Sequence, residues 1–271
     1  MSEARSRRDF LMLAGGATAV AAGAAVLGVA GRADASPSED FPAGLTAVGE
    51  TEKAFTSIDG VPIYYDRNGS LQRLTFYCTN GFYSRLVTWK RRLVTISAGA
   101  GSAYSSLSYF ASAGTYVSKP GAHGLGRAID IDQVVWSGAA SRPIDREYAS
   151  GTLSVRRRYL ALDAVTRGTF RYVLDGWYDA GHQDHIHADD TALPTICSTG
   201  SRSDTVFVQA TCNAFTGTAL TVDGVWGSRT GDAFKAASAR LGVTGDPHTS
   251  SAAWLAWTER AAARGFANLA F

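Results

Sequence analysis

The chain has 271 residues, of which 45% are hydrophobic and 18% are charged, and its formal net charge at pH 7 is +2. This length exceeds one typical domain, so we expect one mid-sized domain plus a small one, with enough apolar residues for their cores. The near-neutral charge argues against nucleic acid as a partner, because nucleic-acid-binding domains are usually strongly basic.

Residues 1–35 read as a targeting segment. They start with "MSEARSRRDFLMLAGG", continue as an apolar run rich in Ala and Gly, and end in the small-x-small pattern "ADA". Arg7 and Arg8 before Phe10 resemble the twin-arginine export signal, with Met12 where the usual pattern has Lys. This resemblance implies a bacterial protein that is exported folded to the cell wall or medium. A retained membrane helix is the alternative, but the composition and the cleavage pattern favour removal.

Residues 36–55 carry Pro, Gly, Ser and acidic residues without a period, so we expect a poorly ordered leader or linker. Helical spacing follows in two segments, at 82–96 and 154–168. The first has Leu86, Trp89 and Leu93 on one stripe, and the second has Val155, Tyr159, Leu162 and Val165, with Gly168 as a stop signal. The basic runs 90–92 and 156–158 within them are expected to be solvated helix faces.

Three short segments alternate or are rich in β-branched and aromatic residues, as strands are: 128–132, 169–175 and 184–189. Helices and strands are interleaved without repeated βαβ units. The pattern therefore favours the α+β class over a doubly wound sheet.

The composition changes after Cys197. Residues 198–204 are expected to form a linker, and residues 205–271 a small module of three short helices. In this module, Asp223 and Gly224 predict a turn, and Ser250 or Ser251 can cap the last helix. Two apolar stripes mark its helices: Phe234, Ala237 and Leu241 on one, and Trp254, Trp257 and Ala261 on the next.

An exported protein with three cysteines is expected to form one disulfide and keep one thiol. Cys197 and Cys212 would close the shortest loop, and Cys78 is the other possible partner.

Four of the five histidines fall in two short segments, "PGAHGLGRAIDIDQ" at 120–133 and "GHQDHIHADD" at 181–190. Catalytic zinc takes about three ligands from His, Cys or Asp/Glu and keeps one open position. His123, Asp130 and one histidine of the second segment supply that set. Asp130 and Asp132 share one face of their strand, and His185 and His187 share a face of theirs, because side chains alternate with period two. Adjacent strands would bring these groups together.

Two alternatives compete with a catalytic zinc site. One is a buried histidine that simply hydrogen-bonds to an aspartate, but two matching segments in one exported chain favour a metal. The other is a structural zinc, which usually has four ligands and favours Cys, whereas the cysteines here lie outside both segments.

His123, Gly126, Ala128 and Asp130 fit the pattern His-x-x-Gly-x-Ala-x-Asp, and residues 185–187 fit His-x-His. Together they resemble the D-Ala-D-Ala metallopeptidases of the lysostaphin and hedgehog-like group, and the region 56–197 is similar to the extensin-like carboxy-terminal domain within that group. The resemblance implies zinc held by His123, Asp130 and His187, on a small α+β fold with an antiparallel sheet and flanking helices.

The resemblance leaves the catalytic base open. Carboxypeptidase-type relatives carry an acid three residues before the last ligand, where this chain has Asp184, one methylene shorter than the usual Glu. Endopeptidase-type relatives carry His-x-x-His-x-His, which His182, His185 and His187 match. A strict strand favours His185 over Asp184, whereas a turn that ends at Asp184 would allow the acid to act. Asp132 is either a carboxylate that supports the ligands or a solvated one. Gly121 replaces the Ser that relatives often carry two positions before the first ligand.

The segment "VDGVWGSRT" at 222–230 resembles the three-helix peptidoglycan-binding domain, although Ala237-Ser238 replaces that family's usual Phe-Gln pair. A helical cap with an aromatic core is the plainer alternative. Taken together, the resemblances imply a secreted, monomeric zinc metallopeptidase, a hydrolase of peptidoglycan stem peptides or cross-links. The competing hypothesis is a zinc-containing protein of the same fold that binds the cell wall and hydrolyses nothing.

Overall fold

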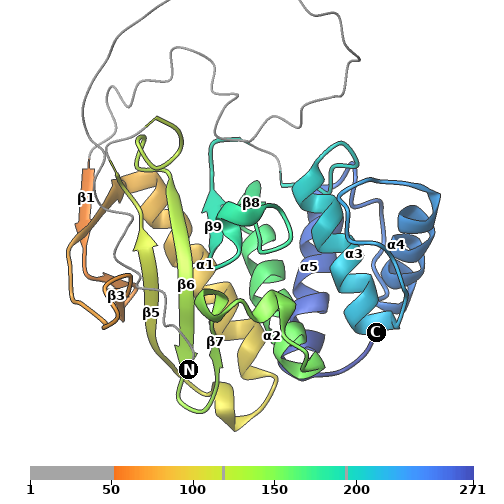
Figure 1. Ribbon diagram of the computed structural model, residues 1–271, viewed down its shortest axis with the longest axis horizontal. Coiled ribbons are helices and arrows are strands. Elements are labelled where there is room, and N and C mark those ends of the chain that lie inside the picture. Colours follow the sequence, from red (N-terminus) through yellow and green to blue (C-terminus); the bar gives the residue numbers. More distant parts are fainter. Residues whose placement is uncertain (1–51, 118–119, 193–194) are drawn as a thin grey trace, which may run out of the picture. The chain divides into compact units, whose positions relative to one another are not determined.

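The computed structural model describes residues 52–117, 120–192 and 195–271, which belong to one compact unit (Figure 1). The predicted export segment and residues 36–51 of the leader lie outside the described residues. For the rest of the leader the expectation of poor order is wrong, since Glu52–Phe55 forms strand β1. This strand pairs antiparallel with β4 (Phe76–Thr79), and the buried Phe55 ring packs 5.9 Å from that of Phe76. Aromatic burial therefore outweighs the polar composition.

A seven-stranded sheet runs in the order β2-β3-β5-β6-β9-β8, with β7 paired to β6. Its strands are β2 (Ser57–Ile58), β3 (Val61–Tyr65), β5 (Leu107–Gly114), β6 (Ala128–Trp136), β7 (Ala140–Ser141), β8 (Tyr172–Leu174) and β9 (Ile186–Asp189). The expected strands at 128–132, 169–175 and 184–189 correspond to β6, β8 and β9. Helices beside this sheet are consistent with the α+β class.

The sheet is mixed, so the expectation of an antiparallel sheet is wrong in one place. Strands β3 and β5 are parallel neighbours, whereas the other paired strands are antiparallel. The chain between them passes through β4 and helix α1 (Asn80–Ala98), and a crossover of that length allows adjacent strands to run parallel.

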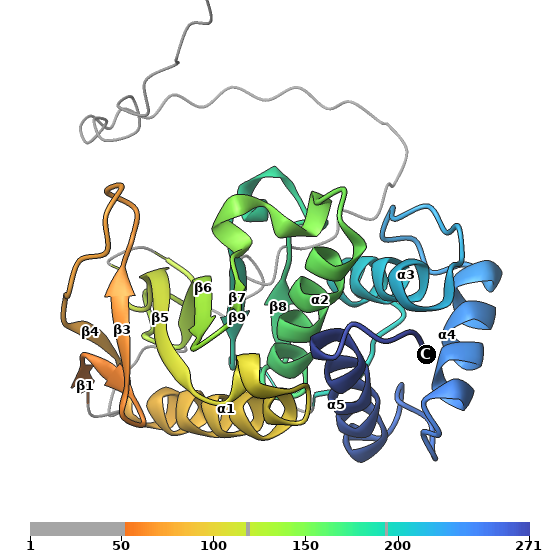
Figure 2. The ribbon, with the colours of Figure 1, turned by 90° about the horizontal axis from the view of Figure 1, so that it is seen from below.

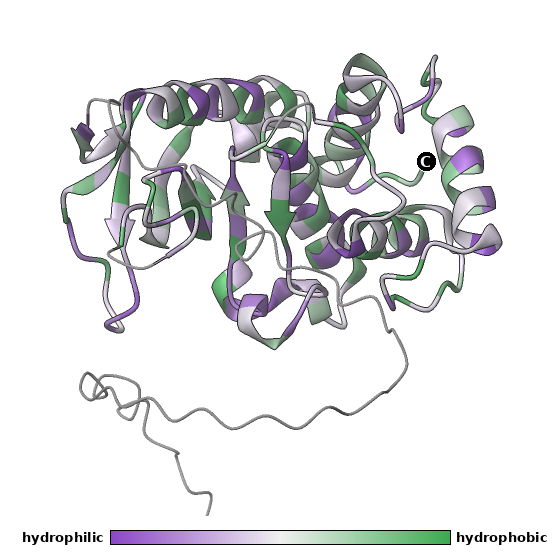
Figure 3. Ribbon diagram, turned by 90° about the horizontal axis from the view of Figure 1, so that it is seen from above, coloured by the Kyte–Doolittle hydropathy of each residue, from purple (hydrophilic) through white to green (hydrophobic). Residues whose placement is uncertain are grey.

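Helix α1 lies along one face of the sheet (Figure 2). Thr79 caps its start by accepting a hydrogen bond from the Phe82 amide. Hydrophilic and hydrophobic bands alternate along the helix in Figure 3, as they do on an amphipathic helix. Its buried side chains include the predicted stripe and are Phe82, Leu86, Trp89, Leu93 and Ser97. The predicted helix is therefore confirmed, together with the face it buries.

Helix α2 (Leu153–Arg167) is more deeply buried than an amphipathic pattern predicts. All its residues from Tyr159 to Arg167 are buried, while Val155 is only partly buried. The reason is that α2 packs against the sheet strand β8 and against the carboxy-terminal helices. Its buried Arg167 forms ion pairs with Asp163 at 2.8 Å, Asp175 at 3.1 Å and Asp204 at 3.1 Å. This network ties α2 to the first helix of the carboxy-terminal segment.

The three helices expected there are α3 (Arg202–Thr216), α4 (Ser228–Arg240) and α5 (Ser251–Phe266). Both apolar stripes are buried, and Ser250 caps α5. Helix α5 contacts α2 so closely that a Cβ at Gly265 would lie 2.5 Å from the Arg157 carbonyl oxygen. Helix α3 begins within the stretch expected to be a linker, with Ser201 as its cap. The division into two modules remains a prediction.

The expected disulfide is not formed. Cys78, Cys197 and Cys212 are all buried free thiols. Burial raises the pKa of both Cys78 and Cys212 to about 12, which keeps these thiols protonated and unreactive. Within the described ranges, no helix is both long enough and apolar enough to cross a membrane.

Candidate metal centre

Three separate elements supply the predicted ligands. His123 lies in the turn between β5 and β6, Asp130 is the third residue of β6, and His187 is the second residue of β9. Strands β6 and β9 are antiparallel neighbours in a register that places Asp130 directly opposite His187. The structure thus makes neighbours of the two strands whose pairing the sequence left open.

Gly126 fixes the turn that carries His123. Its φ is +64°, a left-handed conformation that favours glycine, and an added Cβ would lie 3.2 Å from the Thr79 amide nitrogen. The Gly126 amide donates to the His123 carbonyl at 3.0 Å, and the Gly126 carbonyl accepts from Thr79 at 2.9 Å. The turn is therefore held against the start of α1.

The three ligand atoms form a small triangle. His123 Nε2 lies 3.1 Å from Asp130 Oδ1 and 3.2 Å from His187 Nδ1, and the last two atoms are 3.0 Å apart. Ligands about 2.1 Å from a tetrahedral zinc ion are separated by about 3.4 Å. The observed spacing is therefore within a few tenths of an ångström of what zinc requires, and these three residues are able to hold a metal ion.

Hydrogen bonds on the outer side of each imidazole select the tautomer that a metal needs. His123 Nδ1 lies 2.6 Å from the Thr115 carbonyl oxygen, and His187 Nε2 lies 3.2 Å from Asp189 Oδ2. Each outer nitrogen must donate to these acceptors, which leaves a lone pair on the nitrogen that faces the triangle. Asp189 is held in turn by the Thr191 amide at 3.0 Å.

Charge is concentrated in this site. Burial disfavours the imidazolium of His187, but the hydrogen bonds to Asp130 and Asp189 outweigh it and raise the pKa of His187 to about 9. Burial also disfavours the Asp130 carboxylate, but the bonds to His123 and His187 hold the pKa of Asp130 well below its usual range. Both shifts favour a positive charge beside the Asp130 carboxylate, which is the charge that a metal ion would supply.

The two candidate bases contact each other at the edge of the triangle. His185 Nδ1 lies 2.9 Å from Asp184 Oδ1, while His185 Nε2 lies 3.6 Å from the ligand oxygen of Asp130. Asp184 faces Arg67, whose Nη1 donates to Oδ2 at 2.6 Å. The bond from His185 and the pairing with Arg67 hold the pKa of Asp184 well below its usual range, so this carboxylate is a weak base.

His182 completes the histidine cluster. Its ring centroid lies 5.1 Å from that of His185 and 6.1 Å from that of His187. Its Nδ1 is 2.7 Å from Asp179 Oδ1. Burial lowers the pKa of His182, although Asp179 opposes the shift, so the ring is neutral at pH 7.

Sequence reasoning missed Arg67, which joins the two acidic parts of the site. Besides Asp184, its guanidinium donates to Asp132 through Nη2 at 2.5 Å and Nε at 3.0 Å. Asp132 is therefore buried and paired, not solvated. Burial and the adjacent Asp66 raise the pKa of Asp132 to about 9 against the attraction of Arg67. Arg67 follows strand β3 just before an Asn-Gly turn, so its sequence context resembles that of an ordinary surface turn.

Comparisons of this chain with protein-family models, with curated proteins and with solved structures find no significant match.

Proposed function

We propose that the protein is a secreted zinc metallopeptidase that hydrolyses peptidoglycan stem peptides or their cross-links. The observation that carries this proposal is the convergence of His123, Asp130 and His187, with both imidazole tautomers selected for metal binding. The sequence motifs in the two histidine segments resemble those of D-Ala-D-Ala metallopeptidases, which suggests the substrate. The twin-arginine pattern suggests export to the cell wall.

In this proposal His123, Asp130 and His187 hold the zinc ion. A bound zinc would supply the Lewis acid that polarises the scissile carbonyl. His185 acts as the general base. Its Nδ1 proton is directed to Asp184 at 2.9 Å, so its Nε2 lone pair faces the ligand triangle, where it can take a proton from the attacking water and return it to the leaving amine.

Asp184 serves to orient His185 and not as the base. A carboxylate that accepts from both His185 and Arg67 has little affinity for a further proton, as its lowered pKa indicates. The same pairing of imidazole with carboxylate holds the correct tautomer in serine hydrolases. Arg67 fixes Asp184 on its other side, and Asp132 anchors Arg67 in turn.

His182 is a candidate for contact with the substrate. It is neutral, close to both His185 and His187, and its Nδ1 proton is directed to Asp179. Its outer nitrogen is therefore an acceptor, suited to an amide N–H of a bound peptide.

The carboxy-terminal helices are proposed to bind peptidoglycan. The residues of the resembling motif hold a turn, since buried Gln209 bonds to Asp223 at 2.9 Å and to the Val225 carbonyl at 3.2 Å. A groove of about 280 Å³ opens beside this turn, lined by Leu220, Arg229 and Ser228 among others. Attachment through this face would raise the local concentration of the peptidase at the wall without adding a catalytic contact.

The test is digestion of purified peptidoglycan by the wild type and by two separate variants, His185→Ala and Asp184→Ala, with products identified by mass. We expect His185→Ala to lower the rate about 100- to 10,000-fold while zinc content stays unchanged. Asp184→Ala should lose less of the hydrolysis rate than His185→Ala, because the proposed base His185 remains. Asp145→Ala, at an exposed position outside the carboxy-terminal helices, is the control. Wall binding by the wild type without any product would support the non-catalytic wall-binding protein instead.

A further inference from the structure

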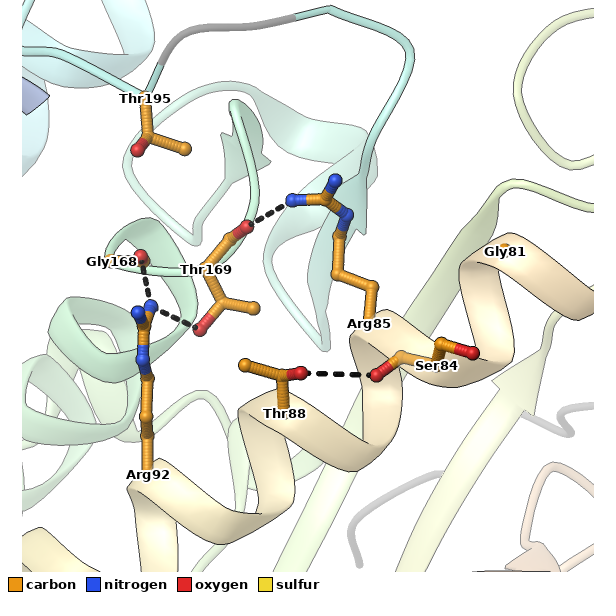
Figure 4. Close-up of a pocket in the computed structure, with 8 residues that line it drawn as sticks. All are labelled: Gly81, Ser84, Arg85, Thr88, Arg92, Gly168, Thr169 and Thr195. Carbon is orange, nitrogen blue, oxygen red and sulfur yellow. Dashed lines mark hydrogen bonds between the residues drawn. The ribbon is translucent and has the colours of Figure 1, made fainter.

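A second polar groove lies away from the ligand triangle, between α1 and the turn that follows α2 (Figure 4). Its volume is about 370 Å³. Two arginines reach into it from one side of α1, and hydroxyl and glycine residues form the rest of its wall. The lining residues are Gly81, Ser84, Arg85, Thr88, Arg92, Gly168, Thr169 and Thr195.

Both guanidinium groups are directed to the same turn. Arg92 Nη1 donates to the Gly168 carbonyl at 2.5 Å and lies 3.4 Å from Thr169 Oγ1, and Arg85 Nη1 donates to the Thr169 carbonyl at 3.2 Å (Figure 4). The two groups are seven residues apart on α1, yet both contact Thr169. They are therefore close enough to contact a single small ligand.

The groove has more positive charge than its carboxylates neutralise. Arg85 pairs with Asp190 at 3.2 Å, but Asp190 also pairs with Arg127 at 2.9 Å, so one carboxylate serves two arginines. Arg92 bonds only to neutral oxygens among the described residues, and none of the described lining residues is acidic. An anion is thus the ligand that the electrostatics of this groove favour.

Capping of α2 explains only part of this arrangement. Arginine side chains often bond to the last carbonyls of a helix, and Arg92 does so at Gly168. That contact uses Nη1 alone, and a guanidinium carries five N–H donors. Nε and Nη2 of Arg92, and Nη2 of Arg85, have no partner among the described residues. These donors remain to bind a ligand.

We propose that this groove binds a phosphate group. A tetrahedral phosphate offers enough oxygens to accept from both guanidinium groups at once, whereas a planar carboxylate matches a single guanidinium fork. The volume exceeds that of a bare phosphate, since one water molecule occupies about 30 Å³. The groove therefore also has room for the alcohol part of a phosphate ester. The phosphate is supplied either free or as a diester within an anionic polymer.

The test is NMR titration of the full chain with inorganic phosphate, with glycerophosphoglycerol as a diester, and with acetate. We expect at least one phosphate compound to cause saturable chemical-shift changes that are confined to residues of the groove, and acetate to bind at least tenfold more weakly. Tighter binding of the diester would identify the polymer as the source, and tighter binding of inorganic phosphate the free anion. Absence of saturable binding, or equal binding of acetate, would overturn the proposal.

Three variants assign the binding to this groove. Arg92→Gln removes the free donors, and Thr88→Glu places a carboxylate in the groove while leaving the Arg92 capping bonds in place. Each should weaken phosphate binding at least tenfold. Arg91→Gln is the matched control, since Arg91 directly precedes Arg92 in α1 and pairs with Asp59 outside the groove. An equal loss of phosphate affinity in Arg91→Gln, or an unchanged affinity in Thr88→Glu, would refute the assignment.

Phosphate is also able to bind a metal, so the titration is repeated with His123→Ala. We expect the groove signals to shift as in the wild type, because this site is independent of the proposed zinc centre. Loss of all phosphate binding in His123→Ala would assign the anion to the metal and contradict the groove.

Discussion

Asp189 provides a sharp test of the metal centre because it selects the tautomer of His187 without being a ligand. Its Oδ2 accepts the Nε2 proton of His187 at 3.2 Å, and its Oδ1 accepts from the Thr191 amide. In Asp189→Asn, the carbonyl oxygen can keep the bond to Thr191, which turns the amide NH₂ toward His187. Two donors then face each other, and His187 is driven to the tautomer whose proton lies on Nδ1, the nitrogen that should bind zinc.

The size of this effect follows from the hydrogen bond that is lost. A buried donor left without a partner costs about 1–3 kcal/mol. The loss of a supporting hydrogen bond typically lowers metal affinity about 10- to 100-fold, which corresponds to about 1.4–2.8 kcal/mol. We therefore expect Asp189→Asn to bind zinc about 10- to 100-fold more weakly than the wild type.

The assay is competition for zinc between the protein and a chelator of known affinity at fixed pH. The control is Asp232→Asn, which makes the same chemical change on the exposed face of α4 and should leave the affinity unchanged. Circular dichroism checks that the fold of each variant is retained. If Asp189→Asn binds zinc as tightly as the wild type, the assignment of His187 Nδ1 as a ligand atom is wrong.

Three further predictions concern stability and the thiols. Trp257→Ala, at a fully buried ring, should lower the free energy of unfolding by about 3–5 kcal/mol, whereas Val225→Ala at an exposed position should change it by less than about 0.5 kcal/mol; urea unfolding measures both. The metal-free protein should lose stability between pH 5 and pH 9. The pKa values of Asp132 and of His187 are both raised to about 9, so the folded state holds protons that the unfolded state releases over this range. Each such group lowers the free energy of unfolding by up to about 1.4 kcal/mol for each pH unit of increase. Urea unfolding in the presence of a chelator measures this change, and a free energy of unfolding that stays constant or rises over this range would contradict these pKa shifts. Finally, a thiol reagent should titrate three thiols per chain in denaturant without reductant. A count of one thiol would show instead that two of the cysteines form a disulfide.

Local patterns in the sequence predicted much of the fold, because each depends only on nearby residues. The stripe of Leu86, Trp89 and Leu93 located α1 and its buried face. Alternation around Asp130 and His187 located two strands and placed their polar side chains on one side. That these strands are neighbours, with the two residues in register, is a property of the sheet that the sequence suggested but did not determine.

Long-range partners account for what the sequence did not predict. Arg67 and Arg92 look like ordinary surface charges until the fold brings Asp184 to one and the end of α2 to the other. Arg167 lies in α2, a helix that was expected to expose one face, but α3 packs against α2 and supplies Asp204 as a partner of Arg167. The parallel pairing of β3 with β5 likewise depends on the crossover through α1, which no local pattern reveals.

Metal analysis of the purified protein and of His123→Ala, combined with digestion of peptidoglycan, is the decisive experiment for a zinc peptidase. We expect about one zinc ion per chain in the wild type, its loss in the variant, and new peptide termini that appear only with the zinc-loaded protein. A wild-type protein that binds no metal after exposure to zinc, or that cleaves peptidoglycan equally well without it, is not a zinc peptidase.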